Sequence, residues 1–262
     1  MDRKRYWNND YLEYWKALTK EANIIGGDDK TSVKKETAGD FKTVGEQTAL
    51  ELFDKIKLEP GDRILDLGCG FGRFYKYFSK YEYYGIDISE AMIKEAQKQY
   101  PEAKRKFMVA EGEELPFPNG FFDKVVCFEV FDACYQEKTL IEMLRITKDN
   151  GKVLFTGKNN RYELDDEQAI IAEQAARKKG HPNYFTDLRK LKGNLSKDIE
   201  IELERYYVRR GDFGKRKYVT EIPDRFYEYA LILKKRGGRM ILNELLPFSD
   251  EYSETWKEKN IN

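Results

Sequence analysis

The sequence feature that most constrains the fold is a short apolar run that ends in a carboxylate and a glycine-rich bend. Residues 64–67 (Ile-Leu-Asp-Leu) have the character of a buried strand, and Gly68, Gly70 and Gly72 follow at alternate positions. Glycine lets the backbone turn tightly and approach a ligand, and a helix that starts here presents free N–H groups. Because parallel sheets bind nucleotides at the carboxyl ends of their strands, the bend predicts a nucleotide-binding α/β domain.

Strand-like and helical stretches alternate along the chain that follows. We expect strands at 64–67, 83–87, 107–109, 125–128 and 152–156, helices that begin near residues 72 and 90, and a helix over 137–147. This succession predicts a parallel sheet with right-handed connections. Two further β-like runs, 199–208 and 225–233, could extend the sheet as an edge hairpin. The predicted fold is a doubly wound, mostly parallel seven-stranded sheet of the Rossmann-like type.

Charge and hydropathy restrict the class of partner. The 262 residues include 47 Lys and Arg and 47 Asp and Glu, so the formal net charge is zero. A neutral chain has no long-range field that would draw it to phosphate backbones or anionic lipid. No stretch approaches the roughly 20 apolar residues that cross a bilayer, and the first ten residues lack the apolar segment of a signal peptide. We therefore expect a cytoplasmic protein that does not bind membranes, and the balanced charge disfavours binding to nucleic acid.

The soft metal ligands of the chain are few. Cys69, Cys127 and Cys134 are not in Cys-x-x-Cys spacing, and His181 is the single histidine. This combination predicts free thiols and no structural metal site. Nothing in the neighbouring sequence indicates a reactive thiolate, so we interpret the cysteines as small packing residues.

The glycine spacing separates two families of nucleotide-binding proteins. A dinucleotide fingerprint G-x-G-x-x-G counted from Gly68 needs glycine where this chain has Arg73. The run 64–73 instead resembles the first motif of the class I S-adenosylmethionine-dependent methyltransferases, an acidic residue followed by x-Gly-x-Gly-x-Gly. The likeness covers about residues 45–157 and includes Asp87 and the Leu-Pro-Phe-Pro stretch at 115–118. It implies S-adenosylmethionine as the cofactor and methyl transfer as the reaction.

The resemblance assigns residues to the methionine portion of that cofactor. Asp66 would help to hold this portion, directly or through water, and Phe128 would border it. Gly68, Cys69 and Gly70 would let the backbone pass close to the ligand. These roles suit a ligand that carries a sulfonium, an ammonium and a carboxylate.

The adenosine portion has its own set of implied contacts. Asp87, at the end of the second predicted strand, would accept both ribose hydroxyls, and Ile88 and Gly112 would flank the adenine. Glu111 stands where the family commonly has aspartate. Its longer side chain leaves the adenine amino contact open.

Three residues are candidates for a base or for contact with the methyl acceptor. Glu129 and Asp132 follow the fourth predicted strand, and Asp132 occupies a place where relatives often have histidine. His181 can titrate near neutral pH. A hydroxyl acceptor benefits from a base within hydrogen-bond reach, whereas a neutral amine attacks before it loses its proton. The alternatives are a helix-start role for the carboxylates and a surface turn for Gly-His-Pro at 180–182.

Acceptor recognition is expected outside the shared motifs. The run 208–217 holds five basic residues and one acidic residue, and Lys158 and Arg161 follow the fifth strand, a pattern that suits a phosphate or carboxylate acceptor. A solvated basic hairpin is the alternative. Aromatic residues near the N-terminus could form a lid over the acceptor or pack against the sheet, and they are Tyr6, Trp7, Tyr11, Tyr14 and Trp15.

These features predict the domain organisation and the function. We expect an N-terminal helical cap over 1–44, a cofactor-binding domain over 45–235 with an acceptor-binding insertion at about 157–200, and a C-terminal tail over 236–262. The leading hypothesis is methyl transfer to oxygen or nitrogen of a small polar metabolite, such as a sugar-like or phosphorylated compound. The alternatives are methylation of RNA or protein, and a catalytically silent cofactor-binding scaffold.

Overall fold

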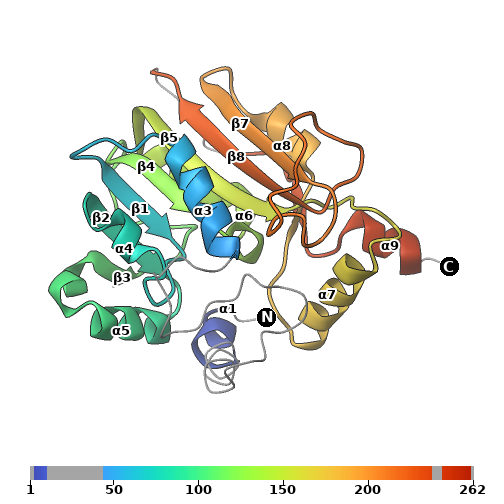
Figure 1. The fold of residues 1–262 in the computed structure, drawn as a ribbon, viewed down its shortest axis with the longest axis horizontal. Helices are drawn as coiled ribbons and strands as arrows, with labels where there is room; N and C mark the ends of the chain where they lie inside the picture. The colour runs from blue at the N-terminus through green and yellow to red at the C-terminus, as the bar shows by residue number, and fades with distance from the viewer. Residues whose placement is uncertain (1–2, 11–43, 238–243, 261–262) are drawn as a thin grey trace.

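A seven-stranded sheet forms the centre of the molecule (Figure 1). The computed structural model describes residues 3–10, 44–237 and 244–260. The strands are β1 (Arg63–Leu67), β2 (Glu82–Asp87), β3 (Phe107–Val109), β4 (Phe122–Cys127), β5 (Thr147–Lys158), β7 (Ile199–Tyr207) and β8 (Glu228–Lys235). They lie in the order β3-β2-β1-β4-β5-β8-β7. The neighbours among β1 to β5 pair in parallel, and β8 pairs antiparallel with β5 and β7, so the mostly parallel sheet with its edge hairpin is confirmed.

Helices cover both faces of the sheet. One face carries α3 (Val44–Lys55), which crosses the near side of the sheet in Figure 1, with α4 (Tyr75–Phe78) and α5 (Glu90–Gln99). The other face carries α6 (Gln136–Ile146) and α8 (Leu188–Asn194). Because both faces are covered, consecutive residues of the central strands are buried, as at positions 64–67 of β1 and 124–127 of β4. In β1, Leu65 packs in the core on the α6 side and Ile64 in the core on the α3 side.

The C-terminal residues pack against the segment that follows β5. Helix α7 (Glu167–Lys178) lies beside α9 (Glu254–Asn260), and β6 (Phe185–Thr186) pairs with β9 (Ser249–Asp250) (Figure 1). The buried Glu173 accepts hydrogen bonds from the Tyr162 hydroxyl and from Ser253 Oγ (2.7 Å), and it pairs with Arg177 (2.8 Å). The helix α9 and the strand β9 show regular structure in a tail for which the sequence predicted no pattern.

Short helical segments complete the described chain. They are α1 (Arg3–Arg5), the π-helix η1 (Tyr6–Asp10) and the 3-10 helices η3 (Pro101–Lys106) and η4 (Phe131–Ala133). The helix expected from Gly72 begins only at Tyr75 and has four residues. Gly72 itself has a φ of +82°, which is outside the helical region, so the glycine bend delays the helix. The predicted helix around Tyr11, Trp15 and Leu18, and most of the predicted cap, lie outside the described residues.

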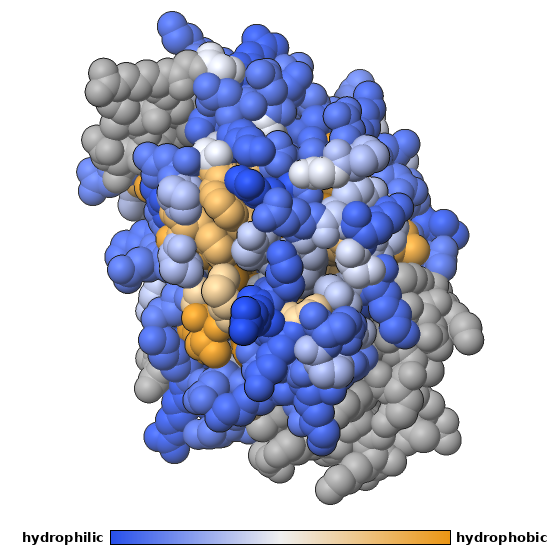
Figure 2. Space-filling view, turned by 90° about the vertical axis from the view of Figure 1, so that its left-hand side faces the viewer, coloured by the Kyte–Doolittle hydropathy of each residue, from blue (hydrophilic) through white to orange (hydrophobic). Residues whose placement is uncertain are grey.

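The strand β3 forms one edge of the sheet. Figure 2, which faces the side of the molecule where β3 and α5 lie, shows an apolar patch bordered by polar side chains. On β3, Val109 is half-exposed.

Within the described ranges, no helix is both long enough and apolar enough to cross a bilayer.

Candidate functional site

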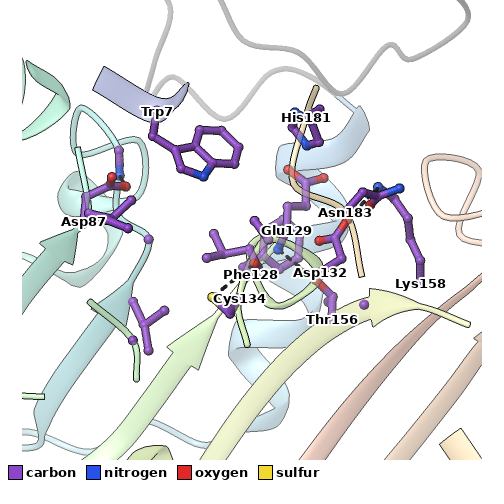
Figure 3. A pocket seen from close by; sticks show the side chains of 18 of the residues that line it. Trp7, Asp87, Phe128, Glu129, Asp132, Cys134, Thr156, Lys158, His181 and Asn183 are labelled. Carbon is purple, nitrogen blue, oxygen red and sulfur yellow. Dashed lines mark hydrogen bonds and ion pairs between the residues drawn. The ribbon is translucent and has the colours of Figure 1, made fainter. Parts of the chain in front are cut away.

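A cleft of about 850 Å³ opens at the carboxyl ends of β1, β2, β4 and β5. This volume lies within the range of roughly 300 to 1,000 Å³ that is usual for small-molecule sites. All of the predicted catalytic and cofactor-binding residues except Glu111 line the cleft. Figure 3 shows Asp87 at one end and Lys158 at the other, with Phe128 and Glu129 between them. The parallel topology therefore gathers residues that are as much as 115 positions apart, from Asp66 to His181, around one cavity.

The glycine bend forms the floor of the cofactor end. The N–H groups of Gly68 and Cys69 donate to the carbonyl oxygen of Ile86 at 2.8 and 2.9 Å, which fixes the bend to the end of β2. Gly68 and Gly70 have φ of +78° and +53°, a region that favours glycine. A Cβ on Gly70 would meet no atom within 4 Å, so the space beside it is open to a ligand.

Asp87 presents a half-buried carboxylate at the end of β2. One of its oxygens accepts a hydrogen bond from the N–H of Gly70 (2.9 Å), and the other accepts one from the N–H of Ser89 (2.8 Å). Burial raises the pKa of Asp87, and these two hydrogen bonds oppose the rise. An ionised carboxylate offers about four acceptor positions, so Asp87 keeps capacity for two ligand hydroxyls. This arrangement suits the predicted ribose contact.

Asp66 lies deeper in the same end of the cleft. Burial, together with the charge of Asp87, raises its pKa to about 7, although the hydrogen bond from the Tyr83 hydroxyl (3.0 Å) opposes the rise. The carboxyl group is therefore divided between its two protonation states near neutral pH. A cationic ligand group beside Asp66 would favour the ionised form. Tyr83 was not predicted as a site residue, because its side chain reaches Asp66 only through the pairing of β1 with β2.

Glu129 follows β4 at the middle of the cleft. Its carboxylate pairs with Arg73 (2.8 Å), and its N–H donates to Thr156 Oγ1 (2.8 Å). Glu129 has a φ of +58°, which is uncommon for a residue with a side chain and is often found at functional sites. The sequence predicted Glu129 as a candidate acceptor contact or base, and the structure adds Arg73 as its ionic partner.

The far end of the cleft holds a buried ion pair. Lys158 Nζ lies 2.5 Å from Asp132 Oδ2 and 2.9 Å from Asn183 Oδ1 (Figure 3). Burial acts to raise the pKa of Asp132, but Lys158 outweighs it and lowers that pKa. Burial acts to lower the pKa of Lys158, but Asp132 outweighs it and raises that pKa. Both groups are therefore charged at neutral pH.

His181 closes this end of the cleft together with the N-terminal residues. Its Nδ1 lies 2.9 Å from the Tyr6 hydroxyl, and the ring of Trp7 lies edge-on at 5.1 Å. Burial, together with the charge of Lys158, lowers the pKa of His181 to about 4, although Asp132 opposes the shift. The ring is therefore neutral at pH 7. Of the predicted lid residues, Tyr6 and Trp7 line the cleft, and the other three, Tyr11, Tyr14 and Trp15, lie outside the described residues.

Two residues that were predicted to contact a ligand, Glu111 and Arg161, form ion pairs with other residues of the chain instead. Glu111 does not line the cleft, and its carboxylate pairs with Lys4 at 2.6 Å. Arg161, a candidate for anion binding, approaches Glu258 at 3.9 Å. In the basic run 208–217, Arg210 lines the cleft. Asn183 and Tyr227 also line the cleft and were not predicted as site residues. Asn183 lies in an irregular segment that no sequence pattern marks, whereas Tyr227 lies in the predicted β-like run 225–233, just before β8.

The cysteines are buried free thiols. Burial raises the pKa of all three, Cys69, Cys127 and Cys134, so the thiols stay protonated at neutral pH. Within the described ranges, no group of three or more potential ligand side chains is arranged to hold a metal ion.

A comparison with known families decides between the nucleotide-binding alternatives. Residues 65–155, which include the glycine bend, Asp87 and the end of β4, match the model of a methyltransferase domain. Over these residues the chain therefore carries a methyltransferase domain, whose cofactor is S-adenosylmethionine. The residues present fit this cofactor, because Asp87 retains acceptor capacity and the space beside Gly70 is open.

Relatives of this methyltransferase domain occur in archaea and bacteria. An uncharacterized protein of Methanocaldococcus jannaschii is 32% identical over 71% of this chain and 64% of its own length. The ubiquinone/menaquinone biosynthesis C-methyltransferase of Burkholderia orbicola is 28% identical over 44% of this chain and 51% of its own length. The chain therefore spans about half to just under two thirds of these curated relatives.

Solved structures share the fold at low sequence identity. One is a chain from the complex between the Haloferax volcanii Trm112 methyltransferase activator and a methyltransferase. It is 16% identical, with a TM-score of 0.59, over 85% of this chain and 98% of that chain. At this identity the similarity concerns the arrangement of strands and helices.

Proposed function

We propose that the protein transfers the methyl group of S-adenosylmethionine to a small polar acceptor bound at the Lys158 end of the cleft. The observation that carries the proposal is the division of one cavity into two ends. Asp66, Asp87 and the glycine bend line the first end, and the ion pair of Asp132 and Lys158 lines the second. The cavity of about 850 Å³ has room for a cofactor and a small acceptor together.

The residues of the first end would bind and orient the cofactor. S-adenosylmethionine supplies an electrophilic methyl group on a positively charged sulfur. Asp87 would accept the ribose hydroxyls, and ionised Asp66 would face the cationic methionine portion. Tyr6, Trp7 and Phe128 line the cleft and would help to exclude water. Orientation and exclusion of water can contribute much of the rate of a displacement reaction.

The acceptor atom is proposed to be oxygen or nitrogen. The polar groups Asp132, Lys158, His181 and Asn183 at the second end support a polar acceptor. Carbon is the second candidate, because the matched Burkholderia relative is named as a C-methyltransferase. We propose a small molecule rather than a nucleic acid, and the zero formal net charge supports this choice.

Calorimetric titration with S-adenosylmethionine and with S-adenosylhomocysteine tests the cofactor half of the proposal. We expect saturable binding of both to the folded wild-type chain. Asp87→Ala should weaken binding by about 1 to 3 kcal/mol, the usual effect of losing a hydrogen bond to a charged group. Asp149→Ala, at an exposed carboxylate outside the cleft, is the matched control and should bind normally. Absence of binding to folded wild-type protein at millimolar ligand would refute the proposal.

Turnover tests the catalytic half. The wild-type chain should form S-adenosylhomocysteine from S-adenosylmethionine when it is incubated with a panel of small hydroxyl and amine compounds. Product formation that also occurs without any acceptor, at an equal rate, would contradict methyl transfer. Retention of tRNA at low salt would instead favour the nucleic-acid alternative.

A further inference from the structure

We propose that Lys158 binds the methyl acceptor through an ionised oxygen, so that the acceptor carries an acidic hydroxyl group rather than an alcohol. This inference rests on the proposed function and names the substrate class of that same cleft. It gives Lys158 a direct role in catalysis, because the oxygen that it holds is the atom that attacks the methyl group.

The hydrogen bonds of Lys158 support this role. Lys158 ends β5 at its carboxyl edge, lines the cleft and has a side chain that is 21% exposed. An ammonium group has three N–H donors. Asp132 Oδ2 at 2.5 Å and Asn183 Oδ1 at 2.9 Å take two of them, and the part of the chain that the structure describes provides no third acceptor. The third donor is therefore available to a ligand in the cleft.

The charges around Lys158 favour an anionic ligand group over a cationic one. Asp132, from η4, is the carboxylate in contact with it. Arg210 lies close enough for its charge to act on Lys158 and lower the pKa of that lysine, and its Nη1 donates to the Tyr227 hydroxyl at 3.1 Å. His181 is neutral at pH 7. Lys158 and Arg210 together carry one more charge than Asp132 neutralises, and a ligand oxyanion would balance this remaining positive charge.

Of the described residues at this end of the cleft, neither Asp132 nor His181 is a strong base, which limits the acceptor. Lys158 lowers the pKa of Asp132, and burial lowers the pKa of His181 to about 4. An alcohol with a pKa near that of water, about 15.7, would lose its proton to such a base with a penalty of roughly twelve powers of ten. A phenol with a pKa of about 10 would face a penalty of roughly six. An acidic hydroxyl that Lys158 stabilises as an oxyanion is the acceptor that this site can use.

The proposed step balances in atoms and charge. The acceptor hydroxyl releases its proton to solvent as the oxyanion forms at Lys158. A lone pair of this oxygen then forms a bond to the methyl carbon, and the carbon–sulfur bond breaks with its electron pair left on sulfur. The negative oxygen and the positive sulfonium are both neutralised, which favours the release of a neutral ether from Lys158.

A chromophoric probe tests the inference without turnover. 4-Nitrophenol changes its absorption when it ionises, so its apparent pKa can be measured while it is bound to protein saturated with S-adenosylhomocysteine. We expect bound 4-nitrophenol to ionise at least one pH unit lower than in solution. Lys158→Gln should abolish this shift, and Lys158→Arg should retain much of it. 4-Nitrobenzoate should compete for the site, whereas 4-nitrobenzyl alcohol should bind at least tenfold more weakly than 4-nitrophenol.

A matched control and a second variant keep the test independent of folding. Lys152→Gln alters another lysine of β5, paired with Glu202 rather than with a cleft residue, and should leave the probe shift unchanged. Because Lys158→Gln leaves Asp132 without its ionic partner, the double variant Asp132→Asn with Lys158→Gln removes both charges and should also lose the shift. Thermal melting confirms that each variant is folded.

Three results would overturn the inference. They are an unchanged shift in folded Lys158→Gln, equal binding of 4-nitrophenol and 4-nitrobenzyl alcohol, and no binding of 4-nitrophenol at millimolar concentration. The proposed function fails separately, because wild-type protein that does not bind S-adenosylhomocysteine would refute cofactor binding itself. Normal binding of S-adenosylhomocysteine with an unshifted probe would refute only the role of Lys158.

Discussion

Replacing Gly68 by alanine should destabilise the protein through a collision with Val130. An ideal Cβ on Gly68 would lie 2.3 and 2.6 Å from the two γ-carbons of Val130 and 2.9 Å from its Cβ. Overpacking of this kind costs about 1 to 3 kcal/mol. The backbone of Gly68 has a φ of +78°, which adds about 1 to 2 kcal/mol for a residue with a Cβ. We therefore expect Gly68→Ala to lower the free energy of unfolding by about 2 to 5 kcal/mol.

A double-mutant cycle measured by urea denaturation separates the two causes. In a Val130→Ala background the collision is relieved, so Gly68→Ala should cost only the backbone term, and the coupling should be about 1 to 3 kcal/mol. Gly70→Ala is the control, because a Cβ there meets no atom within 4 Å. It should cost about 1 to 2 kcal/mol in stability but should impair cofactor binding, since its methyl group would enter the cleft. An equal cost of Gly68→Ala in both backgrounds would refute the steric reasoning.

Three further predictions follow from charge and burial. First, Asp66 has a pKa of about 7, and binding of the cationic cofactor should favour its ionised form, so cofactor affinity should rise with pH through about 7. Calorimetry should find a smaller rise for Asp66→Asn, and equal pH dependence of the two proteins would count against this prediction. Second, the pKa of His181 is about 4 in the folded state and 6.5 in the unfolded state, so its contribution to stability should be present above pH 6.5 and should be lost as pH falls toward 4. His181→Gln should remove this part of the pH dependence of stability in urea melts. An unchanged pH profile would contradict this prediction. Third, Glu173→Ala should lower the free energy of unfolding by about 3 to 5 kcal/mol because Arg177 loses its buried partner. A loss below about 1 kcal/mol in urea melts would show that the contacts of Glu173 contribute little to stability.

Local motifs made the cofactor end of the site predictable. Asp66 and Asp87 each lie at the carboxyl edge of a strand, and the glycines between them follow a fixed spacing. Parallel strands bring such edges together whatever the rest of the chain does. For this reason the sequence located the cofactor end of the cleft and predicted the mostly parallel sheet, although it did not show that the bend would leave α4 only four residues long.

The acceptor end depends on contacts between distant segments, and the sequence predicted less of it. Lys158 and Asp132 were both named as candidates, and their pairing follows from the adjacency of β4 and β5. Asn183 lies in an irregular segment with no periodic pattern. Glu111 pairs with Lys4, which is 107 positions away, and no local signal announces such a partner. The helices α8 and α9 have seven residues each, too few for a clear apolar repeat.

A crystal structure of the protein with S-adenosylhomocysteine would test the central claim most directly. We predict that the ribose hydroxyls lie within hydrogen-bond distance of the Asp87 carboxylate. The sulfur should face the space that leads to Lys158 and Asp132. A ribose bound elsewhere, or a sulfur directed away from Lys158, would contradict the division of the cleft into a cofactor end and an acceptor end.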